Sequence, residues 1–404
     1  MASLFKRIKT MMNFSKRIQI MEQSPIRKLA RDAQKIKEKG IKVYHLNIGQ
    51  PDLKIPKDFF NKLQNYKMEH LEYSDSEGIP ELRKAISEYY KRYDLQFDMD
   101  EILITNGASE AILFSLIALC DSKDNILVPE PFYSNYLNFA KSADVEIKSI
   151  KSNNNYNLAD YDSISSMIDN NTKAILLSNP SNPTGHVYTA KEIETIKTIA
   201  LNHNLWIISD EAYRDFIYTG SEFISLASIK EIEDRTILID STSKRFSACG
   251  ARIGNIASKN KAFLNEILKL CQTRLCAPTL EQIGATELYS IDSALLEKDR
   301  LEYNKRRDLL YNELAPDPNF LCRKPEGAFY MIVKMPDVHA ENFAKWLIND
   351  FVYNNETVLV CPAKGFYLTE GLGLDEIRLS YVLNMEDLKK ACDILKKAIR
   401  EYKK

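Results

Sequence analysis

Short apolar runs alternate with amphipathic helical patterns through the middle of the chain. From about residue 101 to residue 256, each run is rich in β-branched and aliphatic side chains and has the length of a buried strand. The runs that we expect to form strands are residues 102–105, 125–128, 174–177, 206–209, 236–239 and 254–256. This alternation predicts an α/β fold with a largely parallel, doubly wound sheet.

The pattern changes toward both ends of the chain. Near the start, Ser24 is expected to cap a helix that continues to Lys39 and ends at Gly40. Charged helical patterns fill residues 263–310, and later apolar runs indicate strands of a smaller α+β domain. Those later runs are residues 327–333, 358–361 and 377–382. We therefore predict a basic extension (1–20), a segment that joins the small domain (21–48), a large domain (49–290) and a small C-terminal domain (291–404).

Composition narrows the class of protein. A chain of 404 residues with 45% apolar and 27% charged side chains is long enough for two folded domains. Its net charge of −1 attracts neither nucleic acid nor anionic lipid, and its longest apolar stretch, residues 111–120, is about half a membrane span. We expect no nucleic-acid partner and no membrane insertion.

Cysteine and histidine usage adds two further expectations. The 7 cysteines follow no pairing pattern, which favours free thiols in a reducing cytoplasm. The 5 histidines lack metal-ligand spacing, so we expect no metal site. The first twenty residues are basic, with no acid before Glu22, and three interpretations stay open: a frayed extension, an upstream start or a targeting segment.

Three of the predicted strands end in side chains that carry chemistry. Asn182 follows the run at 174–177, Asp210 follows 206–209, and Lys244 follows 236–239. Parallel strands present their carboxyl ends at one edge of a sheet, so an amide, a carboxylate and an amine meet in one crevice. An amine there can form a Schiff base with an aldehyde, and a carboxylate can keep a pyridine nitrogen protonated.

Other residues of the sequence are candidates for binding anions. Small residues including Ala108 and Ser109 begin a predicted helix, where free backbone N–H groups suit a phosphate. Arg252 lies between glycines, and Arg378 lies inside a strand-like apolar run, where a guanidinium needs an anionic partner. Purely structural roles also remain open: Ser109 or Asp210 could cap a helix, and Arg378 could form a structural ion pair.

The order of these residues resembles the class I and II aminotransferases, the fold-type I enzymes that use pyridoxal 5'-phosphate. The resemblance extends over about residues 20 to 400 and is closest to the aspartate aminotransferases. It implies a mostly parallel, seven-stranded doubly wound sheet and a smaller α+β domain. The matching positions are Gly49-Gln50-Pro51-Asp52, Tyr73, Gly78, Arg83, Gly107-Ala108-Ser109, Tyr133, Asn182-Pro183-Thr184-Gly185, Asp210, Tyr213, Ser241, Lys244, Arg252 and Arg378.

The resemblance also implies catalytic roles. Lys244 would form the Schiff base with the cofactor and then transfer protons, while Asp210 would pair with the ring nitrogen. Asn182 and Tyr213 would hydrogen-bond the phenolic oxygen of the ring, and Tyr133 would stack on its face.

Further roles concern the phosphate and the substrate. Ala108, Ser109, Ser241 and Arg252 would hold the phosphate, and Tyr73 would reach it from the second subunit of a homodimer. Arg378 would bind the substrate α-carboxylate, with help from Asn182 and the backbone of Gly49. These roles imply an L-amino acid and a 2-oxo acid as substrates.

The substrate itself is less constrained. Some aspartate-specific relatives carry a lysine where this chain has Ser109, so that marker is missing, although aspartate with 2-oxoglutarate stays our first expectation. Aromatic amino acids, alanine and a lyase reaction on the same fold are the alternatives. Arg245 departs from the usual small residue after the lysine, and we expect it to form a salt bridge at the domain surface rather than a second positive charge at the site. A dinucleotide-binding dehydrogenase is excluded because no Gly-x-Gly-x-x-Gly follows the first strands.

Overall fold

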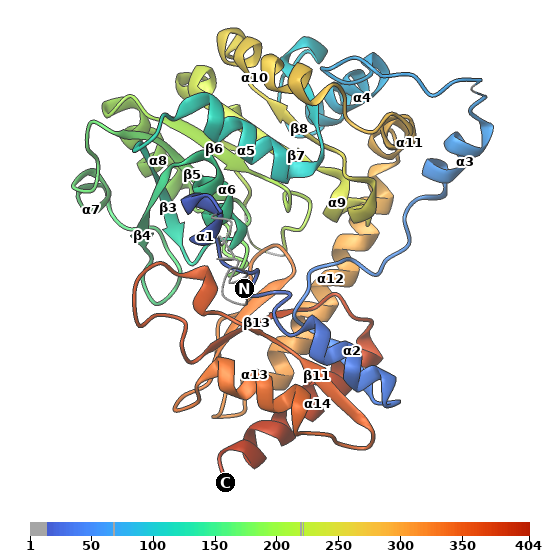
Figure 1. The fold of residues 1–404 in the computed structure, drawn as a ribbon, viewed down its shortest axis with the longest axis vertical. Helices are drawn as coiled ribbons and strands as arrows, with labels where there is room; N and C mark the ends of the chain where they lie inside the picture. Colours follow the sequence, from blue (N-terminus) through green and yellow to red (C-terminus); the bar gives the residue numbers. More distant parts are fainter. Residues whose placement is uncertain (1–13, 68, 219, 221) are drawn as a thin grey trace, which may run out of the picture.

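A seven-stranded sheet lies at one end of the molecule, and a smaller four-stranded sheet lies at the other end (Figure 1). The structure is a computed structural model that describes residues 14–404 except residues 68, 219 and 221. Most of the expected basic extension, residues 1–13, therefore lies outside the described residues. Within the described part of the chain, no helix is both long enough and apolar enough to cross a membrane.

The large sheet has the architecture expected from the alternating pattern. In spatial order its strands are β2 (Ile102–Thr105), β8 (Gly254–Ala257), β7 (Thr236–Ser241), β6 (Trp206–Asp210), β5 (Thr172–Ser178), β3 (Asn125–Glu130) and β4 (Glu146–Lys151). Strand β8 runs antiparallel to both of its neighbours, and the other pairings are parallel. The prediction of a mostly parallel, doubly wound sheet is confirmed.

Strand β4 was missed by the apolar pattern. Its sequence, Glu-Ile-Lys-Ser-Ile-Lys, buries Ile147 and Ile150 but leaves the two end residues exposed. It is one of the two edge strands and pairs with β3 alone, and its burial pattern leaves much of its surface exposed, so its apolar run is short.

Helices cover both faces of this sheet. Ile112 and Leu116 on one side pack against one face, and Ile193 and Ile196 pack against the other. Neighbouring positions of a strand supply the two cores in turn, as the two-residue period of a strand requires. The helices of this end are α3 (Lys57–Asn65), α4 (Pro80–Lys91), α5 (Gly107–Leu119), α6 (Asn135–Ala143), α7 (Tyr161–Ser165), α8 (Ala190–Asn202), α9 (Thr242–Arg245), α10 (Lys261–Arg274) and α11 (Thr279–Tyr289).

The smaller end combines the C-terminal residues with a segment from the N-terminal part of the chain. Its four-stranded sheet has the order β12 (Cys361–Pro362), β13 (Glu376–Ser380), β10 (Tyr330–Lys334) and β9 (Leu321–Cys322). A separate parallel pair joins β1 (Lys42–His45) to β11 (Glu356–Leu359). Its helices are α2 (Ala30–Glu38), α13 (Ala340–Asn349) and α14 (Met385–Tyr402).

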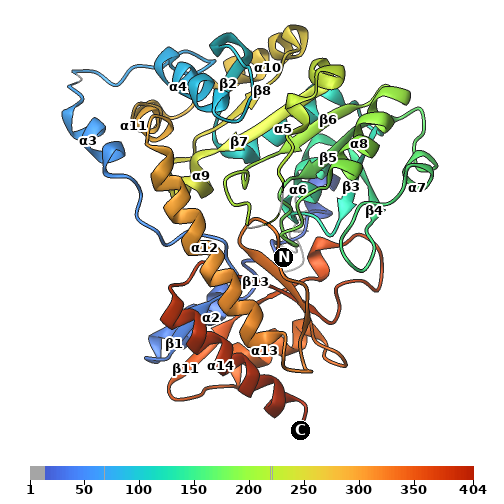
Figure 2. The ribbon, with the colours of Figure 1, turned by 180° about the vertical axis from the view of Figure 1, so that it is seen from behind.

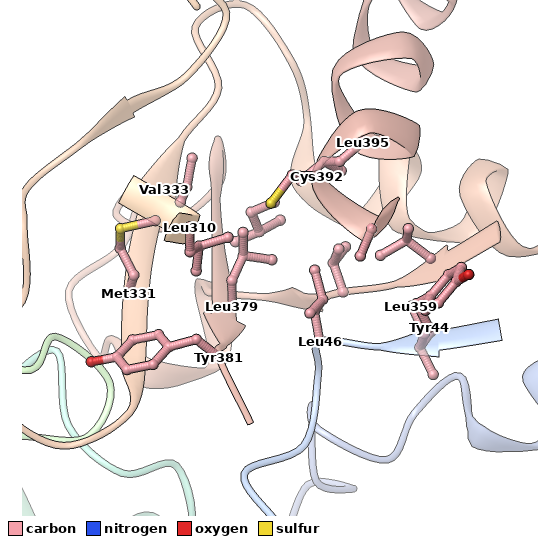
Figure 3. Packing of buried hydrophobic residues seen from close by; sticks show 14 of the residues in the cluster. Tyr44, Leu46, Leu310, Met331, Val333, Leu359, Leu379, Tyr381, Cys392 and Leu395 are labelled. Carbon is pink, nitrogen blue, oxygen red and sulfur yellow. The ribbon is translucent and has the colours of Figure 1, made fainter. Parts of the chain in front are cut away.

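The core of the smaller end connects these pieces. Tyr44 and Leu46 from the N-terminal segment pack with Leu379 of β13 and Leu395 of α14 (Figure 3). The long helix α12 (Ser293–Leu314) runs from the large sheet to this core (Figure 2). The domain limits given above stay a prediction, and α12 begins close to the expected boundary.

The N-terminal helix begins later than expected. Helix α2 starts at Ala30, and residues 24–29 form turns, in which the Arg27 N–H donates to the Ser24 carbonyl at 3.0 Å. Pro25 lies against Gly365, where an added Cβ would approach the proline ring at 2.8 Å. The expected helix start at Ser24 is therefore wrong, because contacts with the smaller end hold this segment as a turn. A short helix, α1 (Lys16–Gln19), precedes it.

Candidate active site

A cavity of about 450 Å³ lies at the carboxyl ends of β5, β6 and β7 and extends to β13 of the smaller end. Most of the predicted site residues line it, and Tyr73 does not. Those that line it are Gly49, Ala108, Ser109, Tyr133, Asn182, Asp210, Tyr213, Ser241, Lys244, Arg252 and Arg378. The amide of Asn182, the carboxylate of Asp210 and the amine of Lys244 therefore lie in one cavity, as expected from the three strand ends.

Lys244 lies in the short helix α9 directly after β7. Ser241 caps this turn by accepting a hydrogen bond from the Ser243 N–H at 3.0 Å. The half-buried Lys244 ammonium donates to the Gly49 carbonyl at 2.9 Å. Its other contact is with Cys249 Sγ at 3.9 Å, and no carboxylate pairs with it among the described residues, so the amine can change partners.

Asp210 is a buried carboxylate at the end of β6. The Tyr136 hydroxyl donates to it at 2.6 Å, and the Ala212 N–H donates to it at 3.2 Å. Burial raises the pKa of Asp210 to about 6. Within the described residues no lysine, arginine or histidine lies in ion-pair contact with it, so the site fits a protonated pyridine nitrogen.

Arg378 is a buried cation on β13. It donates to the Asn182 side-chain oxygen at 3.0 Å and to the Asn47 carbonyl at 2.7 Å, and its guanidinium lies 4.3 Å from the Tyr330 ring centre. No carboxylate pairs with it in the part of the chain that the structure describes, and its Nε has no partner. The structural ion pair considered above is absent there, and the geometry fits a ligand carboxylate.

The start of α5 and Arg252 form an anion cradle. Asn106 precedes the helix as its N-cap residue, so Ser109 lies in the first turn instead of capping it. Gly107 approaches Arg252 so closely that an added Cβ would lie 2.3 Å from Arg252 Nη2. Arg252 donates to the Cys249 carbonyl at 3.1 Å and, among the described residues, has no acidic partner. Its other hydrogen bond is to the Asn106 carbonyl at 3.4 Å. Helix N–H groups and a guanidinium without an acidic partner suit a phosphate.

Two tyrosines at the cavity hold each other. The hydroxyls of Tyr213 and Tyr330 lie 2.9 Å apart, and burial raises the pKa of Tyr213 well above its usual range. Tyr213 thus keeps its proton and can donate it to an oxygen in the cavity. Tyr330 was predicted only as part of a strand and not as a site residue. Gly49 packs closely on Tyr330, since a Cβ added to Gly49 would lie 1.8 Å from the Tyr330 hydroxyl.

Tyr133 and Tyr136 form a second aromatic pair at the cavity. Their ring centres lie 5.5 Å apart at an angle of 86°, and Asn135 donates to the Tyr133 hydroxyl at 2.9 Å. Tyr133 therefore presents a fixed ring beside the Asp210 carboxylate that Tyr136 contacts. This placement fits the stacking position that the resemblance implies.

Arg245 does not face the cavity. Its Nε lies 2.7 Å from Asp215 and its Nη2 lies 2.6 Å from Asp240, with the guanidinium 4.7 Å from the Tyr89 ring centre. The salt bridge that we expected is present, but it is fully buried. The expected place at the domain surface is wrong, because two aspartates and an aromatic ring replace water around the cation.

Tyr73 stays outside this constellation. Its side chain is 78% exposed, in the loop between α3 and α4. Apolar side chains near it are also exposed, and the segment contacts the start of α11, where Thr279 donates to the Glu72 carbonyl. The exposed apolar residues of α3, of this loop and of the segment at the start of α11 include Phe60, Tyr66, Leu71, Leu275 and Leu280.

Comparisons with known proteins agree with this geometry. A family model described as aminotransferase class I and II matches residues 41–395. A probable aspartate aminotransferase from Methanocaldococcus jannaschii is 35% identical over 360 residues, which cover 87% of this chain and 92% of that protein. Among solved structures, an aspartate aminotransferase from Thermotoga maritima is 26% identical with a TM-score of 0.87, covering 96% of this chain and all of that one.

An alanine aminotransferase from Pyrococcus furiosus is similar to the same extent. It is 32% identical with a TM-score of 0.86 and covers 96% of this chain and 100% of its own. The matches thus extend across both ends of the molecule and share one reaction type. The chain belongs to the class I and II aminotransferases, the transaminases that move an amino group between an amino acid and an oxo acid.

Proposed function

We propose that this aminotransferase binds pyridoxal 5'-phosphate in the cavity and uses it to transfer the amino group of L-aspartate to 2-oxoglutarate. The observation that carries the proposal is a set of charges without partners of opposite sign among the described residues. Asp210, Arg252 and Arg378 each point to a different charged group of a ligand. Pyridoxal 5'-phosphate and an amino-acid substrate together supply these three groups: a ring nitrogen for Asp210, a phosphate for Arg252 and an α-carboxylate for Arg378.

The cofactor would be bound at both of its ends. The first turn of α5, Arg252 and Ser241 hold the phosphate, and the carboxylate of Asp210 pairs with the ring nitrogen. Tyr133 covers the ring, and Asn182 and Tyr213 face its oxygen. When bound, pyridoxal phosphate supplies an aldehyde that condenses with amines and a ring that delocalises negative charge.

The remaining residues would orient the substrate and move its proton. Arg378 binds the α-carboxylate through its guanidinium, which fixes the direction of the Cα–H bond relative to the ring. Lys244, released from the Gly49 carbonyl as a neutral amine, would accept that proton at Nζ and would return it on the same face. The Tyr213 hydroxyl keeps its proton and stabilises the neighbouring oxygen by donating to it.

Aspartate is the favoured donor because the cited relatives include proteins named for it. Alanine and aromatic amino acids remain the competing donors, since relatives named for alanine and for aromatic amino acids also match. A panel of amino donors with 2-oxoglutarate, scored for glutamate and for ammonia, separates these substrates and also a lyase reaction.

The active assembly would be a cytoplasmic homodimer. Exposed apolar residues around Tyr73 and Leu275 form a surface that a second copy would bury, which would bring Tyr73 to the partner's phosphate. The cysteines are free, which suits a reducing compartment. Sedimentation of wild-type protein and of a Leu71→Asp variant tests the dimer, because a charge at this surface should yield monomers.

Trapping the cofactor on its lysine tests the proposal most directly. Borohydride reduction of the holoenzyme followed by peptide mapping should place the pyridoxyl group on Lys244. Lys259, which pairs with Glu101 outside the cavity, is the matched control, and a Lys259→Gln variant should label normally. A label on any other lysine of the wild-type protein would refute the assignment.

A further inference from the structure

We propose that Arg27 determines substrate specificity by binding the second carboxylate of a dicarboxylic substrate. This inference rests on the proposed function and deepens it, because it names a residue that separates aspartate and 2-oxoglutarate from alanine and aromatic substrates. It concerns a segment that the sequence pattern assigned to a helix.

The charges of the cavity point to Arg27 by elimination. Among the described residues, the charged side chains that line it are Arg27, Asp210, Lys244, Arg252 and Arg378. Four of these have a task toward the cofactor, the α-carboxylate or the transferred proton. Arg27 is the remaining cation, and an additional cation in a cavity for amino acids fits a substrate with an additional negative charge.

The Arg27 side chain is available for a ligand. It forms no ion pair and no side-chain hydrogen bond within the described part of the chain, whereas the adjacent Lys28 pairs with Glu341 at 3.1 Å. A guanidinium can bind a carboxylate through two parallel hydrogen bonds, which gives direction as well as charge. Arg27 therefore differs from its neighbour in having an open binding geometry beside the cavity.

The backbone that carries Arg27 is fixed in place. The Arg27 N–H donates to the Ser24 carbonyl at 3.0 Å, and the Arg27 carbonyl accepts from the Ala30 N–H at 3.0 Å. Ile26 packs against the cluster that contains Phe366, and Pro25 packs against Gly365. A turn anchored on both sides limits the positions that the Arg27 guanidinium can reach, which lowers the entropy lost when a carboxylate binds.

One residue connects this turn to the α-carboxylate site. Asn47 donates from its side chain to the Ile26 carbonyl at 2.8 Å, and its own carbonyl accepts from Arg378 at 2.7 Å. The segment bearing Arg27 and the Arg378 guanidinium are thus held to the same asparagine. Two cations carried by segments that share this residue suit a ligand with two carboxylates.

The absence of a lysine at position 109 agrees with this role. Ser109 lines the cavity but carries no charge, so the phosphate turn does not supply a cation for a distal carboxylate. Arg27 approaches the same cavity from the N-terminal segment instead. A substrate without a second carboxylate would leave this guanidinium in solvent and gain nothing from it.

Calorimetric titration of the holoenzyme with two unreactive acids tests the inference. Succinate has two carboxylates and butyrate has one, so the ratio of their affinities isolates the second charge. Because Arg27 is exposed, we expect Arg27→Gln to lower the succinate-to-butyrate ratio by about fivefold, with Arg27→Lys in between. Lys28→Gln is the matched control and should keep the wild-type ratio.

The outcomes of the two titrations either support or overturn the role of Arg27. A fall of the ratio in Arg27→Gln with normal butyrate binding supports the inference. Equal losses for both acids, no loss for either, or a wild-type protein that does not prefer succinate would overturn it. Failure of the proposed function would appear differently, as wild-type holoenzyme that forms no glutamate from any amino donor, and it would remove the basis of this inference as well.

Discussion

Asp210 and Asp215 lie five residues apart, and both are buried, yet their surroundings differ. Burial raises the pKa of Asp210 to about 6, because hydrogen bonds from Tyr136 and Ala212 only partly offset it. Burial acts on Asp215 too, but Arg245 and two tyrosine hydroxyls outweigh it and hold the pKa of Asp215 below its usual value. The same carboxylate thus becomes a structural ion or an open ligand site according to its partner.

The difference extends to two groups of residues. We call the first the paired network: Glu211, Arg214, Asp215, Asp240 and Arg245. We call the second the open charges: Asp210, Arg252 and Arg378. Members of the paired network contact each other, and the open charges line the cavity without acidic or basic partners in the described chain. Removing a charge should therefore destabilise the protein in the first group and impair ligand binding in the second.

The largest effect is expected at Arg245. Arg245→Met would leave Asp215 and Asp240 buried with less compensation, so we expect the free energy of unfolding to fall by roughly 3–5 kcal/mol. Urea denaturation followed by circular dichroism measures this. Asp240 and Arg245 flank the Ser241–Lys244 turn. If the free energy of unfolding fell by less than about 1 kcal/mol, the paired network would not stabilise the protein around that turn.

Arg378→Met should give the next largest effect, on binding. Loss of the guanidinium should weaken the binding of amino and oxo acids by roughly 2–5 kcal/mol, because their α-carboxylate loses a buried charged partner. The free energy of unfolding should stay near the wild-type value. Steady-state kinetics measures the first effect and cofactor absorbance the control. Loss of the bound cofactor would contradict the role of Arg378 at the substrate.

Asp210→Asn should stabilise the cofactor-free protein at neutral pH. The pKa of Asp210 is about 6 in the folded protein against 3.8 normally, so the group is neutral in both the folded and the unfolded chain only well below pH 3.8. As pH rises to 7 the carboxyl ionises in both states, and its higher pKa in the folded protein lowers the free energy of unfolding by about 3 kcal/mol. Urea denaturation at pH 4.5 and pH 7 should show the gain shrinking at the lower pH, and a constant gain would refute the titration of Asp210.

The smallest effect is expected at an exposed pair. Lys334 at the end of β10 pairs with Asp375 at 3.0 Å, and both side chains are partly exposed. Lys334→Gln should lower the free energy of unfolding by less than about 1 kcal/mol, because water already solvates both charges. This variant sets the baseline in the same denaturation series, and a loss equal to that of Arg245→Met would remove the contrast between buried and exposed pairs.

Local patterns explain which parts of the fold could be predicted. The strands that deliver Asn182, Asp210 and Lys244 are buried on both faces, so their apolar runs stand out in the sequence. Strand β4 has one neighbour and a partly exposed surface, so charged residues interrupt its apolar run and the sequence pattern does not indicate a strand. The reliable predictions therefore concern the centre of the large sheet.

Contacts between distant segments explain what could not be predicted. The turn at residues 24–29 has helix-compatible residues, but Asn47 and Gly365 hold it in another conformation. Tyr330 reaches the cavity only because β10 pairs with β13, and Arg245 is buried only because Asp215 and Asp240 surround it. Most of these partners are distant in sequence, and Asp240, five residues from Arg245, is matched to it only by the turn after β7, so a pattern along the chain carries no signal for these contacts.

The parallel pair of β1 and β11 has a consequence for synthesis on the ribosome. Tyr44 and Glu356 share a hydrogen bond although they lie 312 residues apart. At usual elongation rates, β1 waits roughly 15 to 60 seconds before its partner strand emerges. The segment that supplies Gly49 to the cavity, and Asn47 as a partner of Arg378, follows β1 directly. Nascent chains should therefore acquire a complete cavity only near the end of translation.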